Sequence, residues 1–367
     1  MMESQAMRQI LCTTCLAVAL AMSATADAQP ATRTAAATQP STRTRQQIEA
    51  LIDQAGKTPP DWWDSVQLTY PQTLDLTWTD IKGAPWNPQK NVGQYLWDVI
   101  HPNPKRWQEG VKFMHHVLSL SKDNPQTQQR AMDSLSHMYG ELLQDYARGA
   151  FWARKTGQNP IRLANCYWKL GSKSMAVEIL RRIGGDNTRN GTVIKLWADM
   201  GEYDTALRLA EQSARTGWAD AAYLAAGDAC RLAGRFPKAL AYYQKVLATT
   251  QGGRDLAVNK KRAQASIDAV KVFDALDLSR IPDGKYTSSS NGYAGEVEVQ
   301  VTIAAGRITD VQVLQHHEKQ FYASIDATSA QIIEKQGVKG VDATSGATVT
   351  SEAIINASAK ALSGAMR

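Results

Sequence analysis

The chain has 367 residues, which is enough for two or three domains of ordinary size. Hydrophobic residues make up 43% of it and charged residues 21%, a composition that argues against a collagen-like, wholly disordered or coiled-coil protein. The formal net charge is +6, and no cluster of basic residues with interleaved aromatic residues stands out. A nucleic-acid partner is therefore not expected.

The first residues predict a secretory signal peptide. Arg8 precedes an apolar run from Ile10 to Met22, and small residues then lead to Ala26-Asp27-Ala28. A basic residue, a short apolar core and an A-x-A triplet are the parts of such a peptide, and the run is shorter than the roughly 20 residues of a membrane anchor. We therefore expect residues 1–28 to be removed, leaving an exported protein that is soluble in the periplasm or another extracytoplasmic space.

Two of the four cysteines, Cys12 and Cys15, lie in this leader. Cys166 and Cys230 remain, both in apolar surroundings with a helical pattern, and we expect buried free thiols there. A disulfide between them stays open, because the sequence does not give their distance. No Cys/His spacing resembles a zinc site, and no metal is expected.

The next two segments differ in composition. Residues 29–45 are rich in Ala, Thr, Gln, Ser and Arg and predict a flexible linker, followed by a short helix over 45–55. Residues 46–103 form a Trp- and Pro-rich irregular segment, and all ten tryptophans lie between Trp62 and Trp218. Such a cluster can line a groove for a peptide or a sugar, but we favour packing of irregular segments, because each Trp buries a large area.

Residues 104–276 show helical periodicity and an internal repeat. Gly201-Glu-Tyr-Asp-Thr-Ala-Leu recurs as Gly234-Arg-Phe-Pro-Lys-Ala-Leu, with a weaker copy at Gly171 and a fainter one at Gly140. The copies lie roughly 30 residues apart, close to the tetratricopeptide period, and the unit resembles that repeat, with Gly at the turn between paired helices. We expect an α-helical tetratricopeptide-like solenoid, which serves either as a scaffold or as a concave surface for a protein partner.

Residues 281–367 predict a small α+β domain after a boundary near 276–282. Residues 296–303 alternate between polar and β-branched apolar residues, Ala305-Gly306 supplies a turn, and residues 307–314 continue as a second strand. This pattern is typical of a β-hairpin with one buried face. A helix is expected around 325–336.

A hydroxyl-rich turn with one glycine, residues 342–350, then leads into the last helix. We expect Thr350 or Ser351 to cap that helix and Glu352 to lie in its first turn. A helix N-terminus offers unpaired N–H groups and positive potential. The residues alone therefore suggest a phosphate-bearing ligand near Ser345 to Thr350.

Residues 281–362 resemble the FMN-binding domain family, which includes the covalently flavinylated subunits of sodium-pumping NADH:quinone reductases and related electron-transport complexes. The resemblance rests on Asp283-Gly284-Lys285-Tyr286, on Gly292-Tyr293 before the hairpin, and on the segment from Val341 to Thr348. The family's attachment signature is complete here as Asp342, Ser345, Gly346, Ala347 and Thr348.

This resemblance implies FMN as the cofactor, joined by a dedicated flavin transferase to Thr348 as a phosphoester. It also implies transferase recognition and phosphate binding by Asp342, Ser345 and Gly346. Gly346 and Ala347 leave room for a bulky group to approach the backbone, and Thr350 is counted among the expected cofactor-binding residues. Aromatic candidates for the surroundings of the flavin ring are Tyr293, Phe321 and Tyr322, and no residue is assigned a catalytic role.

The leading hypothesis is an exported electron-transfer flavoprotein whose repeats dock a redox or scaffold protein. The respiratory relatives are membrane-anchored and no anchor follows the leader here, so we expect a soluble carrier, with any membrane association running through a partner. One alternative is a repeat-based interaction scaffold with a non-redox domain. Another is an enzyme that uses the tethered FMN to reduce a small molecule directly.

Overall fold

The structure is a computed structural model, and it describes residues 42–79, 83, 85–183, 191–250, 252–253, 255–318, 323–344 and 347–366. The predicted leader and nearly all of the predicted linker lie outside these residues. Within the described part, no helix combines the length and the apolar character that crossing a bilayer requires.

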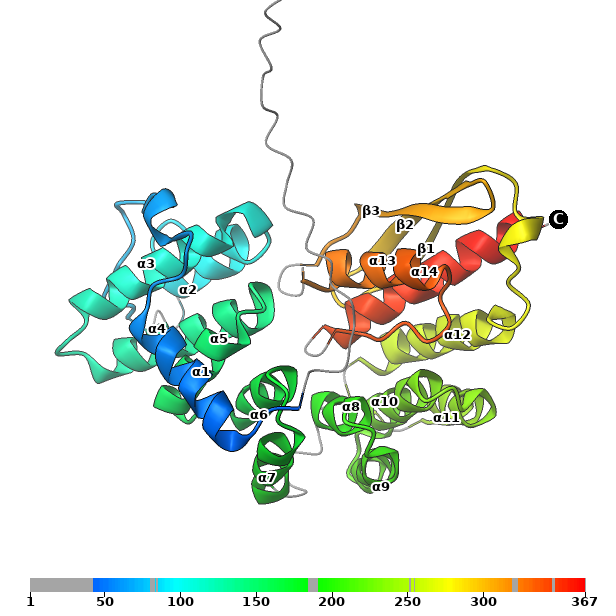
Figure 1. Ribbon diagram of the computed structural model, residues 1–367, viewed down its shortest axis with the longest axis horizontal. Helices are drawn as coiled ribbons and strands as arrows, with labels where there is room; N and C mark the ends of the chain where they lie inside the picture. The colour runs from blue at the N-terminus through cyan, green and yellow to red at the C-terminus, as the bar shows by residue number, and fades with distance from the viewer. Residues whose placement is uncertain are drawn as a thin grey trace, which may run out of the picture. The chain divides into compact units, whose positions relative to one another are not determined.

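Helices fill the described chain as far as Val272, and a small sheet with two helices follows (Figure 1). The α-helices are α1 (Arg45–Lys57), α2 (Val92–Tyr95), α3 (Trp107–Leu120), α4 (Pro125–His137), α5 (Tyr146–Thr156), α6 (Pro160–Lys169), α7 (Lys173–Ile183), α8 (Gly191–Asp199), α9 (Tyr203–Ala214), α10 (Ala219–Leu232), α11 (Phe236–Ala248), α12 (Leu256–Val272), α13 (Ala323–Lys335) and α14 (Thr348–Ala365). Shorter helical turns are η1 (Trp63–Ser65), η2 (Leu96–Ile100), η3 (Pro104–Arg106), η4 (Met138–Leu142) and η6 (Leu278–Arg280). The strands are β1 (Gly284–Asn291), β2 (Glu296–Ala304) and β3 (Arg307–Gln315). The expected fold class, a helical repeat region followed by a small α+β domain, is confirmed.

The tryptophan-rich segment packs on the first helices. Trp62, Trp63 and Trp78 are partly buried against a core cluster that includes the fully buried Phe113 of α3. Lys112 ties the segment down, since its ammonium donates to the carbonyl oxygens of Trp63 at 2.9 Å and of Val66 at 2.7 Å. These contacts agree with packing, and Trp63 also lines a smaller cavity of about 280 Å³.

Glycines mark the turns of the repeats as expected. Gly171, Gly201 and Gly234 have φ of 98°, 79° and 68° and join α6 to α7, α8 to α9 and α10 to α11. Residues with a Cβ rarely adopt this left-handed backbone conformation, whereas glycine adopts it without steric cost. The fourth copy is wrong: Gly140 lies inside η4, where a Cβ added to Gly149 would come 2.7 Å from its Cα. Gly140 therefore permits a close helix contact and does not make a turn.

The sheet is antiparallel, in the order β1-β2-β3. The predicted hairpin is confirmed, with Val297, Val299, Val301 and Ile303 of β2 buried and with Ala305-Gly306 at the turn, both at positive φ. Strand β1 was not expected, because its Lys-Tyr-Thr-Ser-Ser-Ser sequence lacks apolar alternation. Backbone pairing with β2 holds this strand in place.

Helix α14 is buried along most of its length. It packs on β1 and β2, on α12 and on α13 (Figure 1), and its Ala- and Ser-rich sequence lets these elements approach closely. Helix α12 in turn packs on α10 and α11, and Asn356 of α14 donates to the Ser266 hydroxyl of α12 at 3.1 Å. One cluster of buried apolar side chains consequently runs from the repeat helices into the α+β domain.

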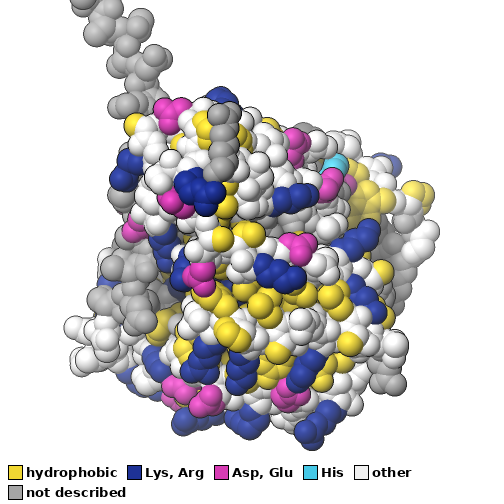
Figure 2. Space-filling model, turned by 90° about the vertical axis from the view of Figure 1, so that its right-hand side faces the viewer, with side chains coloured by type: hydrophobic (Ala, Val, Ile, Leu, Met, Phe, Trp, Pro, Cys, Tyr) yellow, Lys and Arg dark blue, Asp and Glu magenta, His cyan; other side chains and the backbone are white. Residues whose placement is uncertain are grey.

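The remaining cysteines, Cys166 and Cys230, are buried free thiols. Burial raises the pKa of the Cys166 thiol to about 12, so the reactive thiolate is scarce at neutral pH. On the face drawn in Figure 2, basic and acidic side chains are interspersed and hydrophobic side chains lie between them. The positive net charge is therefore not gathered into one patch on that face.

Candidate functional site

The signature loop, which we define as residues 342–348, joins α13 to α14. Helix α14 begins at Thr348 with Ala347 as the N-cap residue, and no side chain caps it. The expected cap at Thr350 or Ser351 is therefore wrong, because the helix starts before both residues. The Ser351 hydroxyl instead accepts a hydrogen bond from the Thr344 N–H at 3.0 Å and ties the loop to the helix.

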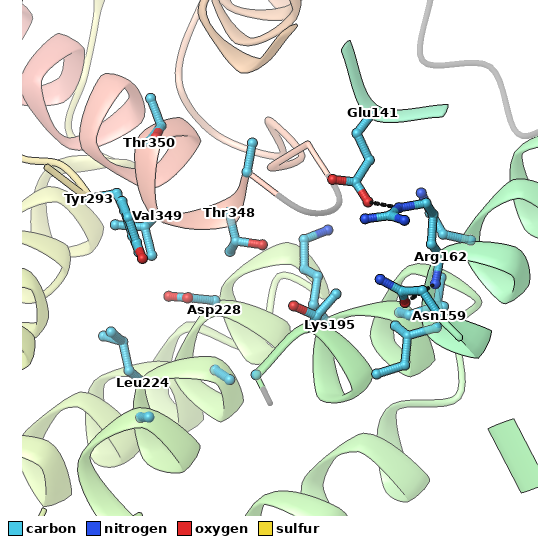
Figure 3. A pocket seen from close by; sticks show the side chains of 18 of the residues that line it. Glu141, Asn159, Arg162, Lys195, Leu224, Asp228, Tyr293, Thr348, Val349 and Thr350 are labelled. Carbon is cyan, nitrogen blue, oxygen red and sulfur yellow. Dashed lines mark hydrogen bonds and ion pairs between the residues drawn. The ribbon is translucent and has the colours of Figure 1, made fainter. Parts of the chain in front are cut away.

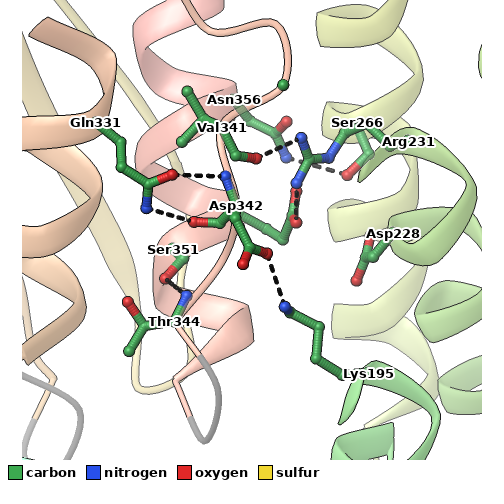
Figure 4. A network of polar contacts seen from close by, with 12 residues as sticks. Lys195, Asp228, Arg231, Ser266, Gln331, Val341, Asp342, Thr344, Ser351 and Asn356 are labelled. Atoms are coloured by element: carbon green, nitrogen blue, oxygen red, sulfur yellow. Dashed lines mark hydrogen bonds and ion pairs between the residues drawn. The ribbon is translucent and has the colours of Figure 1, made fainter. Parts of the chain in front are cut away.

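Helix α13 holds the other end of the signature loop. The Gln331 side chain, which is 7% exposed, donates to the Asp342 carbonyl oxygen at 2.9 Å and accepts from the Asp342 N–H at 3.0 Å. One amide side chain thus satisfies both backbone groups of Asp342 and fixes where the loop begins (Figure 4).

The repeat helices also grip the loop. Lys195 of α8 is 5% exposed, and its ammonium lies 2.8 Å from Asp342 Oδ1 and contacts Asp199 as well. Burial by itself would lower the pKa of Lys195, but the two carboxylates outweigh that effect and raise it above the usual value. Lys195 is therefore a permanent cation beneath the signature loop.

A second buried cation, Arg231 of α10, binds both sides of the loop. It donates to the Val341 carbonyl oxygen at 3.0 Å and to Glu352 Oε1 of α14 at 2.5 Å (Figure 4). Arg231 is 1% exposed, and the neighbouring carboxylate of Glu352 raises its pKa against the effect of burial. The repeats and the α+β domain thus share a buried ionic contact at the site.

Asp228 of α10 faces the same region and is buried. The Tyr243 hydroxyl donates to its Oδ1 at 2.8 Å. Burial, aided by the negative charge of Glu352, raises the pKa of Asp228 to about 8, so its carboxyl is mostly protonated at neutral pH. A neutral acid beside the signature loop can donate as well as accept hydrogen bonds.

This assignment predicts a pH effect on stability. A folded-state pKa near 8 against 3.8 in the unfolded chain means that stability falls as the pH rises from about 4 to about 8. Asp228→Asn resembles the neutral acid at every pH and therefore removes this pH dependence of the stability. We expect wild type to lose up to about 1.4 kcal/mol per pH unit relative to the variant between pH 6 and pH 8. Urea unfolding at several pH values measures the difference, and parallel stability curves would contradict the assignment.

A cavity of about 730 Å³ lies between the repeat helices and the start of α14, within the usual size range of ligand sites. Faces of α8, α10 and α12 line it, together with residues 347–350, and charged side chains of α4, η4 and α6 border one part. Thr348 is half-buried and lies on the wall of this cavity (Figure 3).

The two sides of the cavity differ in chemistry. Figure 3 shows Leu224, Tyr293 and Val349 on one side of Thr348, and Glu141, Asn159 and Arg162 on the other. We call the first side the apolar end and the second the charged end. In the charged end, the Arg162 guanidinium donates to Glu141 at 2.7 Å and to Asp133 at 2.9 Å, so its charges are already paired.

The structure brings most of the predicted site residues together. The cavity is lined by Ala347, Thr348 and Thr350. Asp342 forms an ion pair with Lys195, which also lines the cavity. Ser345, Gly346, Phe321 and Tyr322 lie outside the described residues. Tyr293 borders the cavity, and its backbone N–H donates to Glu318 at 2.7 Å.

Sequence reasoning missed the contribution of the repeats. Lys195, Arg231 and Asp228 are charged residue types that lie among apolar residues on helices α8 and α10. Ionisable side chains are rarely buried without partners, so each was a signal of a polar contact across the domain boundary. Nothing in the local pattern indicates which distant residue supplies that contact.

Comparisons with known proteins agree with this architecture. Residues 292–363 match the FMN-binding domain family, and residues 222–257 match the tetratricopeptide repeat. An uncharacterized protein of Treponema pallidum (strain Nichols) is 42% identical over 86 residues, which are 23% of this chain and 24% of that protein. The match thus spans about a quarter of the relative's length. No solved structure matches the chain significantly. The domain's cofactor is FMN.

Proposed function

We propose that this chain, whose carboxy-terminal part is an FMN-binding domain, is an exported electron-transfer flavoprotein that carries FMN as a phosphoester on Thr348. One observation carries the proposal: the threonine that completes the attachment signature is the first residue of α14 and lies on the wall of a ligand-sized cavity.

The surroundings of Thr348 fit a phosphate group. The N–H groups of the first turn of α14 lack helical partners, and the helix dipole favours negative charge there. Lys195 also lines the cavity, and Asp199 and Asp342 already pair with its charge. Thr350, which is fully buried, has a hydroxyl without a hydrogen-bond partner among the described residues. Ala347 adds only a small side chain next to Thr348.

FMN supplies the electron chemistry, and a phosphoester leaves its ring unchanged. The chain's own part is to hold the group. Gln331, Lys195 and Arg231 fix the signature loop, so the attached group stays within reach of one cavity instead of diffusing away. In an exported protein, such a tether prevents loss of the cofactor.

The proposal includes two protein partners. A flavin transferase attaches the cofactor during maturation, and the tetratricopeptide-like helices dock a redox or scaffold protein. The match to the tetratricopeptide repeat supports the docking of a protein partner, because stacked units of such repeats build extended binding surfaces. The interaction scaffold without redox function is the competing function, because repeat helices make up most of the described chain.

Co-production with a flavin transferase tests the proposal. We expect wild type to show a fluorescent flavin band on a denaturing gel and Thr348→Ala to show none. Thr344→Ala is the matched control, because it removes a hydroxyl from the same loop and should keep the band. A fluorescent Thr348→Ala protein, or a dark wild type from a host that flavinylates a known relative, would refute the attachment and favour the scaffold.

A further inference from the structure

The apolar end of the cavity has a wall made by one face of α10. Ala221, Leu224, Ala225 and Asp228 follow one another at helical spacing and all line the cavity. In a repeat helix such small side chains usually meet a neighbouring helix. Here the two alanines and Leu224 border open space and form a low apolar surface.

A fixed polar edge lies beside this surface. Arg262 of α12 donates to the Gly292 carbonyl oxygen at 2.7 Å and to Asn259 Oδ1 at 2.9 Å, and the Asn259 amide donates to Asp220 at 2.8 Å. Arg262 and Asn259 both line the cavity. Their positions are therefore set by hydrogen bonds, and the buried Nε of Arg262 has no partner among the described residues.

Two aromatic side chains border the same end. Tyr293 is 54% exposed and Trp218 is 38% exposed, although aromatic residues of this size are usually more buried. Trp218 stands next to the Gly253 backbone, where an added Cβ would lie 2.9 Å from its ring. Exposed aromatic faces next to a small-residue surface suit a flat aromatic ligand.

The charged end offers a poorer fit for such a ligand. Glu141 accepts from Arg162 at 2.7 Å and pairs with His137 Nδ1 at 2.8 Å, so the charges of Glu141 and Arg162 are already paired, whereas His137 Nε2 has no partner among the described residues. The face of an aromatic ring placed there would cover paired charges and remove their remaining hydration, which is costly.

We propose that α10 and α12 hold the flavin ring of the Thr348-linked cofactor in the apolar end, with Ala221, Leu224 and Ala225 under the ring and Arg262 and Asn259 at its hydrogen-bonding edge. This inference rests on the proposed attachment to Thr348. It makes the repeats a second half of the cofactor site, in addition to any role in docking a partner.

A matched pair of cavity-filling variants tests the placement. Ala221→Trp fills the apolar end and Ile161→Trp fills the charged end, and both residues are half-buried on the cavity wall. Both are made as full chains with a flavin transferase, and intact mass and urea unfolding confirm attachment and folding. The readouts are the visible absorption spectrum and the quenching of flavin fluorescence by iodide.

We expect Ala221→Trp to shift the spectrum and to increase iodide quenching several-fold, while Ile161→Trp leaves both unchanged. The reverse pattern would place the ring in the charged end and overturn the inference, as would equal effects of the two variants. No effect in either, with FMN attached to Thr348, places the ring outside the cavity; the inference then fails and the proposed function stands. If wild type carries no FMN, both the inference and the proposed function fail.

A third variant tests the polar edge. Loss of the Arg262 positive charge in Arg262→Gln should disfavour the negative charge that reduction brings to the ring. We expect the midpoint potential to become more negative by about 30 mV, which is a tenfold change for a two-electron couple. Lys261→Gln, an exposed neighbour on α12, is the control and should leave the potential unchanged. An unchanged potential in Arg262→Gln would exclude Arg262 from contact with the ring.

Discussion

Replacing Arg231 with methionine is expected to lower the free energy of unfolding by about 3–5 kcal/mol, because the change breaks a buried ion pair from one side. Glu352 is 7% exposed and would lose the guanidinium that pairs with it, and the Val341 carbonyl oxygen would lose its donor. Urea unfolding at pH 7 measures the loss. Since Arg231 joins a repeat helix to the signature loop, the loss reports how strongly the two parts depend on one another.

A double-mutant cycle with Glu352→Gln separates the ion pair from other effects. Removing the carboxylate charge should cancel part of the penalty, so that the double variant is more stable than the sum of the single losses predicts. A loss below about 1 kcal/mol in Arg231→Met, the size seen for exposed pairs, would show that this contact is not buried in solution.

The second large loss of stability is expected when Lys195 is replaced with methionine. Two carboxylates, those of Asp199 and Asp342, would then share a partly buried site without the ammonium that bridges them, and only the more distant charges of Lys169 and Arg231 would remain. We expect a loss of about 3–5 kcal/mol at pH 7. The folded-state pKa values of both acids should rise in the variant, so the loss should shrink as the pH falls toward 4, where the folded carboxyls take up protons.

The matched control for this prediction is Lys173→Met, which removes a lysine from an exposed pair with Glu202 on the repeats. Surface pairs contribute about 0–1 kcal/mol, so this variant should remain close to wild type at every pH. A Lys195→Met protein whose deficit does not change between pH 4 and pH 7 would contradict the shared-cation account of the signature loop.

Local patterns were sufficient to predict the elements with strong periodicity. The β2–β3 hairpin followed from alternation around Ala305-Gly306, and the repeat turns followed from glycines at regular spacing. Strand β1 was not predictable in this way, because its serine-rich sequence has no apolar alternation to mark the buried face. The start of α14 was placed too late, since the hydroxyl residues that resemble caps serve other contacts, as Ser351 does with Thr344.

The site was predictable only on the side that carries the family signature. Asp342 and Thr348 came from a contiguous motif, whereas Lys195 and Arg231 lie more than one hundred residues earlier in the chain. The periodicity of a helix shows only whether a residue lies on a solvated or a packed face. It does not show a contact with a residue of a separate domain. For the same reason the repeats were expected to serve only a partner protein, and their place in the cavity wall was missed.

The central claim is the covalent bond between Thr348 and FMN, and peptide mapping tests it most directly. Trypsin should release residues 340–360 as one peptide, between Lys339 and Lys360, and this peptide contains every hydroxyl residue of the signature loop. From protein matured with a flavin transferase, we predict a mass increase equal to FMN less one water, with fragment ions that place it on Thr348. An unmodified peptide, or a modification on Thr344, Ser345 or Thr350, would contradict the account.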